Sequence, residues 1–225
     1  MNFLQTPVTF PNPRTADRNG IVGIGGDLQV ATLVQAYTKG IFPWFSESDP
    51  MPVWWSPPER MILIPGEEKV SKSMKQVLKK GTVECSFDEA FEAVIRNCAY
   101  AERPDQDGTW ITEEMIQAYL KLHEAGYAHS IEVWRDDLLI GGLYGVAVGK
   151  AFCGESMFSA EPNASKIAFI KLCQWLKDHD FKILDCQNHT AHLESLGAYL
   201  VKREDYLTIL QTAVSLPGIP GLWSL

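Results

Sequence analysis

The sequence lacks the features that mark a secreted or membrane-spanning protein. Its five cysteines are an odd number and include no C-x-x-C pair, which does not favour a disulfide framework. The run 138–149, the longest without a charge or a proline, has twelve residues and is too short to cross a bilayer as a helix. No Lys or Arg precedes Arg14, and no continuous apolar segment opens the chain, so a signal peptide is not indicated. These absences predict a cytoplasmic protein with reduced thiols and no membrane partner.

The sequence also has no internal repeat and no complete nucleotide or hydrolase motif. The glycine-rich segment 23–28 has Leu28 where G-x-G-x-x-G requires its third glycine. The segment 154–158 has Phe158 where G-x-S-x-G requires its last glycine. Neither a phosphate loop nor a serine nucleophile is therefore expected. No metal site is expected either, because three possible ligands at three-residue steps have no evident fourth partner: Cys186, His189 and His192.

The composition is that of a folded protein, and it changes near residue 60. Of the 225 residues, 46% are hydrophobic and 21% are charged, which excludes a disordered chain. Residues 1–60 hold eight of the thirteen prolines and three of the seven tryptophans. We therefore expect a small N-terminal domain over residues 1–60 and a larger domain over residues 61–225.

Periodicity after residue 60 predicts helices alternating with strands. Two turn-type pairs, at 136–137 and 149–150, separate three extended stretches and indicate an antiparallel meander. A further strand after the next helix could return parallel, so the fold class expected is α+β, a mixed sheet covered by helices. Acidic or amide side chains are expected to cap three helices: Asp27, Asp88 and Asn163. The helices are expected at 28–39, 71–80, 88–98, 112–124 and 163–178, and the strands at 82–87, 129–135, 138–148, 151–158 and 181–186.

The net charge of −8 argues against a protein that coats nucleic acid, yet one segment is basic. Residues 61–80 carry five lysines against two glutamates, a local balance of +3. Three of these lysines would share one face of a helix: Lys72, Lys75 and Lys79. Such a stripe is often only a solvated surface. Tryptophans flank it in sequence at Trp44 and Trp110, and exposed indoles beside lysines suit a nucleic-acid end, because bases stack on them without sequence demands.

Polar side chains interrupt two apolar strands in the second half of the chain. A strand over 183–187 would direct Asp185 and Gln187 to the same face, and Glu155 is a similar polar side chain within the expected strand at 152–158. A buried carboxylate needs a partner or a function. Each group alone could be a structural hydrogen bond, but three groups on two strands favour a catalytic site.

Six segments, taken together and in order, resemble the leucyl/phenylalanyl-tRNA–protein transferase family over nearly the whole chain. Several are six or more residues long, which makes the resemblance specific. They are GIFPWF at 40–45, WWSP at 54–57, GTWIT at 108–112, HSIEVWR at 129–135, FCGESMFS at 152–159 and DCQ at 185–187.

The resemblance implies transfer of leucine or phenylalanine from its tRNA to the N-terminal amine of a protein that begins with Arg or Lys, which marks that protein for degradation. It also implies that the second domain has the fold of the acetyltransferases that use coenzyme A (GNAT-like), although coenzyme A and other cofactors are not expected. An apolar pocket discriminates poorly between donor side chains of similar size, so methionine could also be a donor.

The resemblance further implies roles for individual residues. The terminal adenosine of the tRNA would lie against Trp44, Trp110, Tyr37 and Tyr119. The donor side chain would lie among Leu143, Phe152, Met157, Phe169, Leu172 and Leu176. The polar centre would be Glu155, Asp185 and Gln187, and the tRNA backbone would contact Lys72, Lys75, Lys79 and Lys80, although Gln76 stands where the family's basic helix carries a further charge.

Physical chemistry agrees with this assignment. An aminoacyl ester is already activated, so the enzyme needs to hold amine and carbonyl together and to manage one proton. We hypothesise that Asp185 orients the Gln187 amide for catalysis, while Glu155 or Asp185 recognises the cationic acceptor. Two alternatives stay open. An acyl-CoA N-acetyltransferase would need a pyrophosphate-binding R/Q-x-x-G-x-G/A loop that is missing here, and a non-catalytic tRNA-end-binding module would not need Asp185 and Gln187.

Overall fold

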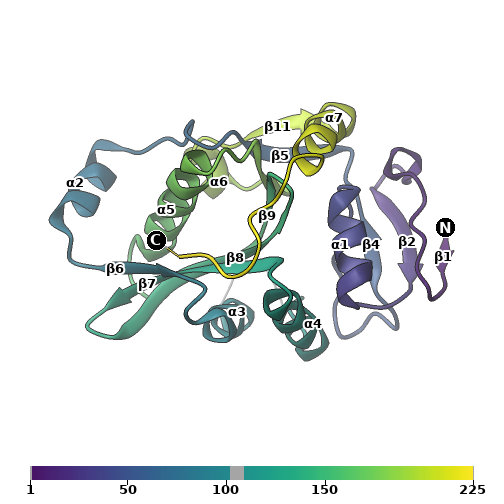
Figure 1. The fold of residues 1–225 in the computed structure, drawn as a ribbon, viewed down its shortest axis with the longest axis horizontal. Coiled ribbons are helices and arrows are strands. Elements are labelled where there is room, and N and C mark those ends of the chain that lie inside the picture. The colour runs from purple at the N-terminus through teal and green to yellow at the C-terminus, as the bar shows by residue number, and fades with distance from the viewer. Residues whose placement is uncertain (1, 102–108, 225) are drawn as a thin grey trace.

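The computed structural model describes residues 2–101 and 109–224, so Gly108 of the 108–112 segment lies outside the described residues. Two sheets lie side by side in an elongated molecule (Figure 1). The smaller has the strand order β1-β2-β4-β3 and carries helix α1. Its elements are β1 Phe3–Leu4, a 3-10 turn at Pro13–Thr15, β2 Ile21–Gly25, α1 Val30–Thr38, β3 Phe42–Pro43 and β4 Val53–Trp55.

The larger sheet has seven strands in the order β11-β5-β10-β9-β8-β7-β6. Its strands are β5 Glu59–Leu63, β6 Glu84–Phe87, β7 Ala128–Arg135, β8 Leu138–Val148, β9 Ala151–Ser159, β10 Ile183–Gln187 and β11 Tyr199–Lys202. The helices are α2 Lys72–Lys80, α3 Phe91–Tyr100, α4 Glu113–Glu124, α5 Ala164–Asp178, α6 Ala191–Ser195 and α7 Arg203–Val214.

The predicted meander and the mixed sheet are confirmed. Strands β7, β8 and β9 pair antiparallel, and β10 then pairs parallel to β9. The turn between β7 and β8 has positive φ at Asp136 (49°) and Asp137 (65°), and the next turn has Gly149 at φ 58°. Such turns match the twist of the strands they join. The α+β class expected from the sequence is therefore correct.

The helices cover both faces of the large sheet. Helix α5 packs on one face, where its apolar side chains join those of β7, β8 and β10 in one core. Helices α3 and α4 pack on the other face and share a core with α1 of the small sheet, so that this core joins the two sheets. No helix among the described residues is long and apolar enough to span a bilayer.

The three expected side-chain caps are not the caps that the structure uses. Helix α1 begins after Gln29, and the Asp27 carboxylate accepts hydrogen bonds from the Gln29 N–H at 3.0 Å and the Thr32 hydroxyl at 2.6 Å. Helix α3 begins after Ala90 because the carboxylate of Asp88 is engaged elsewhere, by donors described below. Asn163 precedes α5 in a left-handed conformation with no side-chain cap.

The large sheet opens between β9 and β10. The two strands pair only from Ala151↔Ile183 to Cys153↔Asp185. Beyond that point the β8–β9 register shifts near Gly154, and the β10–β5 register shifts before Gln187, whose φ is 60°. These irregularities part the strands, and the space between them contains the site.

Candidate active site

A cavity of about 600 Å³ lies in the opening between β9 and β10, with a mostly apolar wall. Four of the residues expected to hold the donor side chain line it: Leu143, Met157, Phe169 and Leu172. The other two, Phe152 and Leu176, are fully buried and do not line it, so they form a layer behind the wall. Leu184 and Phe42 line the cavity and were not expected there.

The polar end of the cavity is formed by Glu155 on β9 and Gln187 at the end of β10. The Gln187 Nε2 donates to Glu155 Oε1 at 2.6 Å. Burial raises the pKa of Glu155 to about 7, although hydrogen bonds from Tyr37 and Tyr119 lower it. A carboxyl with this pKa can take up or release a proton near neutral pH.

Tyr37 and Tyr119 lie behind Glu155 and not at the cavity surface. Both are buried, and neither lines the cavity, so the structure does not place them against an adenosine. Their hydroxyls are hydrogen-bonded to each other, and the Tyr119 hydroxyl donates to Glu155 Oε2 at 3.2 Å. The pair therefore joins α1, on the small sheet, to the carboxyl of the large sheet.

Asp185 is also behind the cavity wall, and it is tightly held. Arg60 donates two hydrogen bonds to it, from Nε at 2.8 Å and from Nη2 at 2.7 Å, in a fully buried ion pair. The Tyr206 hydroxyl donates a third at 2.7 Å, and the backbone N–H of Gln187 donates a fourth at 2.9 Å. Asp185 thus fixes the backbone of Gln187 and not its side-chain amide, contrary to our expectation.

Sequence reasoning missed Arg60 and Tyr206. The Arg60 guanidinium lies between two rings, 4.5 Å from the centroid of Phe42 and 4.6 Å from that of Tyr206. Phe42 itself lines the cavity. One signal could have identified Arg60, namely a lone arginine at the start of the apolar run 61–64.

The mouth of the cavity carries the two indoles singled out from the sequence, Trp44 and Trp110. Trp44 is 39% exposed and meets Trp55 edge to face at 5.4 Å between centroids. The indole N–H of Trp55 donates to the Trp44 carbonyl at 2.7 Å, which holds this aromatic pair in place. Exposed aromatic surface is thus available beside the cavity.

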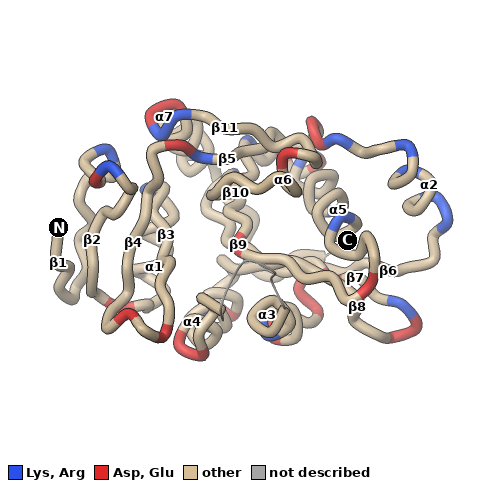
Figure 2. The backbone as a smooth tube through the Cα atoms, turned by 180° about the vertical axis from the view of Figure 1, so that it is seen from behind, with Lys and Arg blue, Asp and Glu red and all other residues tan. Residues whose placement is uncertain are grey.

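Helix α2 lies at the end of the molecule opposite the small sheet (Figure 2). Its four lysines are exposed, and among the described residues none of them forms a salt bridge. The Ser71 hydroxyl caps the helix by accepting the Met74 N–H, and Met74 is its buried contact with the core. The expected basic stripe is therefore a free surface.

The three possible metal ligands at 186–192 are not gathered. Cys186 and His192 line the cavity, whereas His189 Nε2 lies 3.1 Å from Glu194 Oε2. In the part of the chain that the structure describes, no group of three or more His, Cys, Asp or Glu side chains could hold a metal ion.

Comparisons with known proteins agree on one family. Residues 26–58 match the leucyl/phenylalanyl-tRNA protein transferase N-terminal domain, and residues 62–211 match the leucyl/phenylalanyl-tRNA protein transferase model. The chain is 50% identical to the leucyl/phenylalanyl-tRNA–protein transferase of Hydrogenovibrio crunogenus, over 97% of this chain and 86% of that protein. Its identity is 47% to the enzyme of Anaeromyxobacter dehalogenans strain 2CP-C, over 96% and 92%, and 49% to that of Maridesulfovibrio salexigens, over 98% and 92%.

Proposed function

The chain belongs to the leucyl/phenylalanyl-tRNA–protein transferase family and is an aminoacyltransferase, and from this premise we propose its substrates and mechanism. It transfers leucine or phenylalanine, and also methionine, from tRNA to the N-terminal amine of cytoplasmic proteins that begin with Arg or Lys, which marks them for degradation. The observation that carries the proposal is an apolar cavity that ends in Glu155 and Gln187 and opens beside the exposed indole of Trp44 and the half-buried indole of Trp110.

The donor side chain fills the apolar part of the cavity. Leu143 and Met157 supply the sheet side of the wall, and Phe169 and Leu172 supply the α5 side. None of these side chains carries a hydrogen-bonding group that would select one apolar donor sharply. One methylene more or less changes the binding free energy of the donor by only about 1–3 kcal/mol in such a site, so leucine, phenylalanine and methionine are all accepted.

Glu155 and Gln187 act on the acceptor amine. The Gln187 Nε2 is held by Glu155, which leaves Gln187 Oε1, the other polar atom of the amide, to accept a hydrogen bond from the attacking nitrogen. The ionised Glu155 attracts the cationic acceptor and takes the proton that its ammonium group must lose. The C–N bond then forms and the ester C–O bond breaks. Of the two protons that the nitrogen loses, one passes to the ribose oxygen of the leaving tRNA and the other is released from Glu155 to solvent.

Asp185 is a positioning residue in this scheme. Its charge is neutralised by Arg60, and it reaches the reaction only through the backbone of Gln187. Holding that backbone at φ 60° keeps the amide aimed at the cavity. The structure therefore supports Glu155, and not Asp185, as the carboxylate that meets the acceptor.

The tRNA binds by stacking and by charge. Its terminal adenosine stacks on Trp44 and Trp110 at the cavity mouth. The phosphate backbone of the acceptor stem lies on the α2 stripe, formed by Lys72, Lys75, Lys79 and Lys80.

The direct test mixes the purified protein with radiolabelled Leu-tRNA or Phe-tRNA and a peptide that begins with Arg. Label is expected to move to the peptide, and prior RNase treatment is expected to abolish transfer. The Gln187→Ala variant should lose transfer, whereas Gln211→Ala, at an exposed glutamine on α7, should keep it. Transfer from acetyl-CoA instead, or tRNA binding with no transfer, would contradict the proposal.

Removing the α2 lysines is expected to weaken tRNA binding and not the chemistry. In the triple variant Lys72→Ala, Lys75→Ala, Lys79→Ala, the KM for aminoacyl-tRNA should rise about tenfold at physiological salt while kcat changes little. The dependence of this KM on salt concentration should become weaker. For each lysine–phosphate contact that is lost, about one counterion fewer is released when the tRNA binds. Transfer kinetics at several salt concentrations measure both effects.

A matched control changes three other exposed lysines to alanine, at positions 121, 182 and 202, and so produces the same net charge. This control should keep nearly the wild-type KM. Equal increases in both triple variants would show a general effect of charge and would remove α2 as a specific tRNA surface.

A further inference from the structure

The chain beyond α7 returns to the large sheet and ends on the face that α5 covers (Figure 1). We call residues 215–224 the C-terminal strap. Trp223 in the strap is only 3% exposed, although it is near the end of the chain. It joins the same core as the α5 side chains and the cavity residues Leu143, Phe169 and Leu172.

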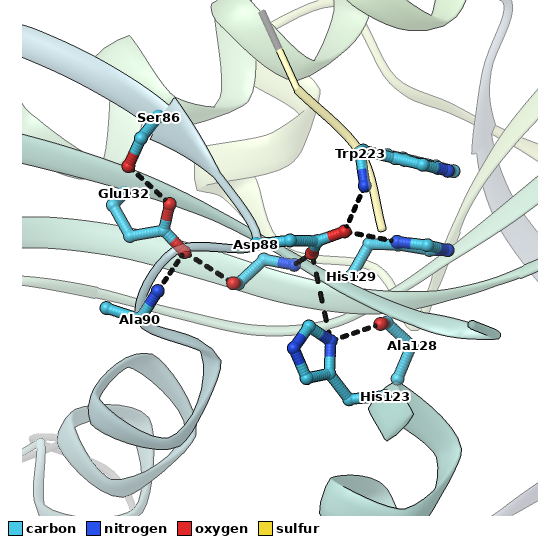
Figure 3. A network of polar contacts seen from close by, with 9 residues as sticks. Ser86, Asp88, Ala90, His123, Ala128, His129, Glu132 and Trp223 are labelled. Carbon is cyan, nitrogen blue, oxygen red and sulfur yellow. Dashed lines mark hydrogen bonds and ion pairs between the residues drawn. The ribbon is translucent and has the colours of Figure 1, made fainter. Parts of the chain in front are cut away.

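Polar contacts fix the strap at two points. The backbone N–H of Trp223 donates to Asp88 Oδ2 at 2.6 Å (Figure 3). The same carboxylate is held by His129 Nδ1 at 2.7 Å and by the Ser130 N–H at 2.8 Å, so it cannot turn away. The Trp175 indole N–H donates to the carbonyl of Ser224 at 3.0 Å.

The indole of Trp223 is a flat spacer between the sheet and α5. It stacks on His129 of β7 with centroids 3.7 Å apart and planes at 8°. On its other face it stacks on Trp175 of α5, at 4.0 Å and 21°. The distance between β7 and α5 at this point is therefore set by the thickness of one aromatic ring.

The two residues that stack on Trp223, Trp175 and His129, are both connected to the cavity wall. On α5, Trp175 follows Leu172 by three residues, so the two side chains lie one above the other on one face of the helix. On the sheet, His129 shares a face of β7 with Ile131, which is paired with Leu143 of β8. Leu172 and Leu143 are on the α5 and sheet sides of the cavity.

A third contact, between Trp223 and Phe152, connects the strap to the β10 side of the cavity wall. Phe152, which lies behind the cavity, has its ring centroid 5.6 Å from that of Trp223. Phe152 is paired with Leu184 of β10, which lines the cavity. Trp223 thus supports Leu172 and Leu184 of the wall through one intervening residue each, and Leu143 through two, while it does not itself line the cavity.

We propose that Trp223 is a positioning residue that sets donor specificity: as the spacer between β7 and α5, it fixes the width of the aminoacyl pocket. The inference rests on the proposed function, because it concerns the donor that this pocket takes. Without the ring, α5 settles toward the sheet and the pocket narrows, so a phenylalanyl donor loses more than a leucyl donor.

The test compares three substitutions that remove the ring in steps. Trp223→Phe keeps a flat aromatic spacer, although a smaller one, and the indole N–H that it removes has no hydrogen-bond partner among the described residues. Trp223→Leu keeps an apolar side chain that is not flat, and Trp223→Ala leaves a gap. For each folded variant, kcat and KM are measured with Phe-tRNA and with Leu-tRNA, and the thermal midpoint is recorded.

The Phe-to-Leu ratio of kcat/KM is expected to fall about fivefold to tenfold in Trp223→Ala. This corresponds to about 1 kcal/mol, the lower end of the discrimination that one methylene provides in an apolar pocket. It should fall less in Trp223→Leu and stay within about twofold of wild type in Trp223→Phe. An unchanged ratio in the Ala and Leu variants would overturn the proposal, as would a Phe variant that behaves like the Ala variant. If Trp223→Ala does not fold, the Leu variant decides.

Failure of this inference can be told apart from failure of the proposed function. If the wild-type protein transfers neither amino acid, the proposed function fails. If the wild type transfers both and the ring-free variants lose both equally, the strap serves stability only, and the assignment of specificity to Trp223 is wrong.

Discussion

An Arg60→Met variant is expected to be less stable than the wild type by about 3–5 kcal/mol at pH 7. The substitution leaves the carboxylate of Asp185 buried without its cation, although the Tyr206 hydroxyl and the Gln187 N–H still donate to it. An uncompensated buried charge costs far more than the pair itself contributes. Urea unfolding followed by circular dichroism measures the difference.

The double variant Arg60→Met, Asp185→Asn provides the control. It removes the Asp185 charge that the single variant leaves without a partner. The carbonyl oxygen of the introduced amide can still accept hydrogen bonds. About half of the lost stability should therefore return. A loss below about 1 kcal/mol in the single variant would mean that the pair is hydrated in solution and does not fix the backbone of Gln187.

Glu155→Gln is expected to lower kcat/KM by about 10²–10⁴, because the glutamine has the shape of the acid but can take no proton. In the wild type, activity should rise with pH through about 7, where Glu155 ionises. The variant should show only residual transfer without this rise. Transfer rates between pH 5 and pH 9, with wild-type and variant protein on the same tRNA preparation, test both statements.

The same substitution is expected to stabilise the protein at high pH. Burial raises the pKa of Glu155 from 4.5 to about 7, so the native state holds a proton that the unfolded chain has lost between these values. The stability that this proton provides is present below pH 4.5 and is lost as pH rises to 7. Relative to wild type, Glu155→Gln should therefore gain up to about 3 kcal/mol between pH 5 and pH 8. A constant difference across this range would show that Glu155 has an ordinary pKa.

Local sequence was enough to predict the middle of the fold. The turn at Asp136 and Asp137 and the turn at Gly149 separate strands that pair with their neighbours in the chain, so the meander could be read from short segments. The apolar spacing of α5 likewise predicted which of its residues face the sheet, Phe169 and Leu172 among them.

The parts that could not be predicted depend on contacts between distant segments. The local sequence indicated a helix cap at Asp88, but Trp223, 135 residues later in the chain, holds this carboxylate instead. The local sequence also indicated that Asp185 is free for catalysis, but Arg60, 125 residues earlier, neutralises it. Nothing in the residues around either carboxylate indicates such a partner, because the pairing arises only when the strands assemble.

The hydroxyl pair of Tyr37 and Tyr119 has a consequence for the evolution of this chain. Tyr37 comes from helix α1 on the small sheet, yet through Tyr119 it is hydrogen-bonded to the carboxyl of Glu155 on the large sheet, which we propose as the proton acceptor. Removing residues 1–57 would take away both the cover that raises the pKa of this carboxyl and the Tyr37 hydrogen bond that lowers it. The first 57 residues thus help to set the pKa of Glu155, and exchanging this segment for one that lacks Tyr37 is expected to change that pKa.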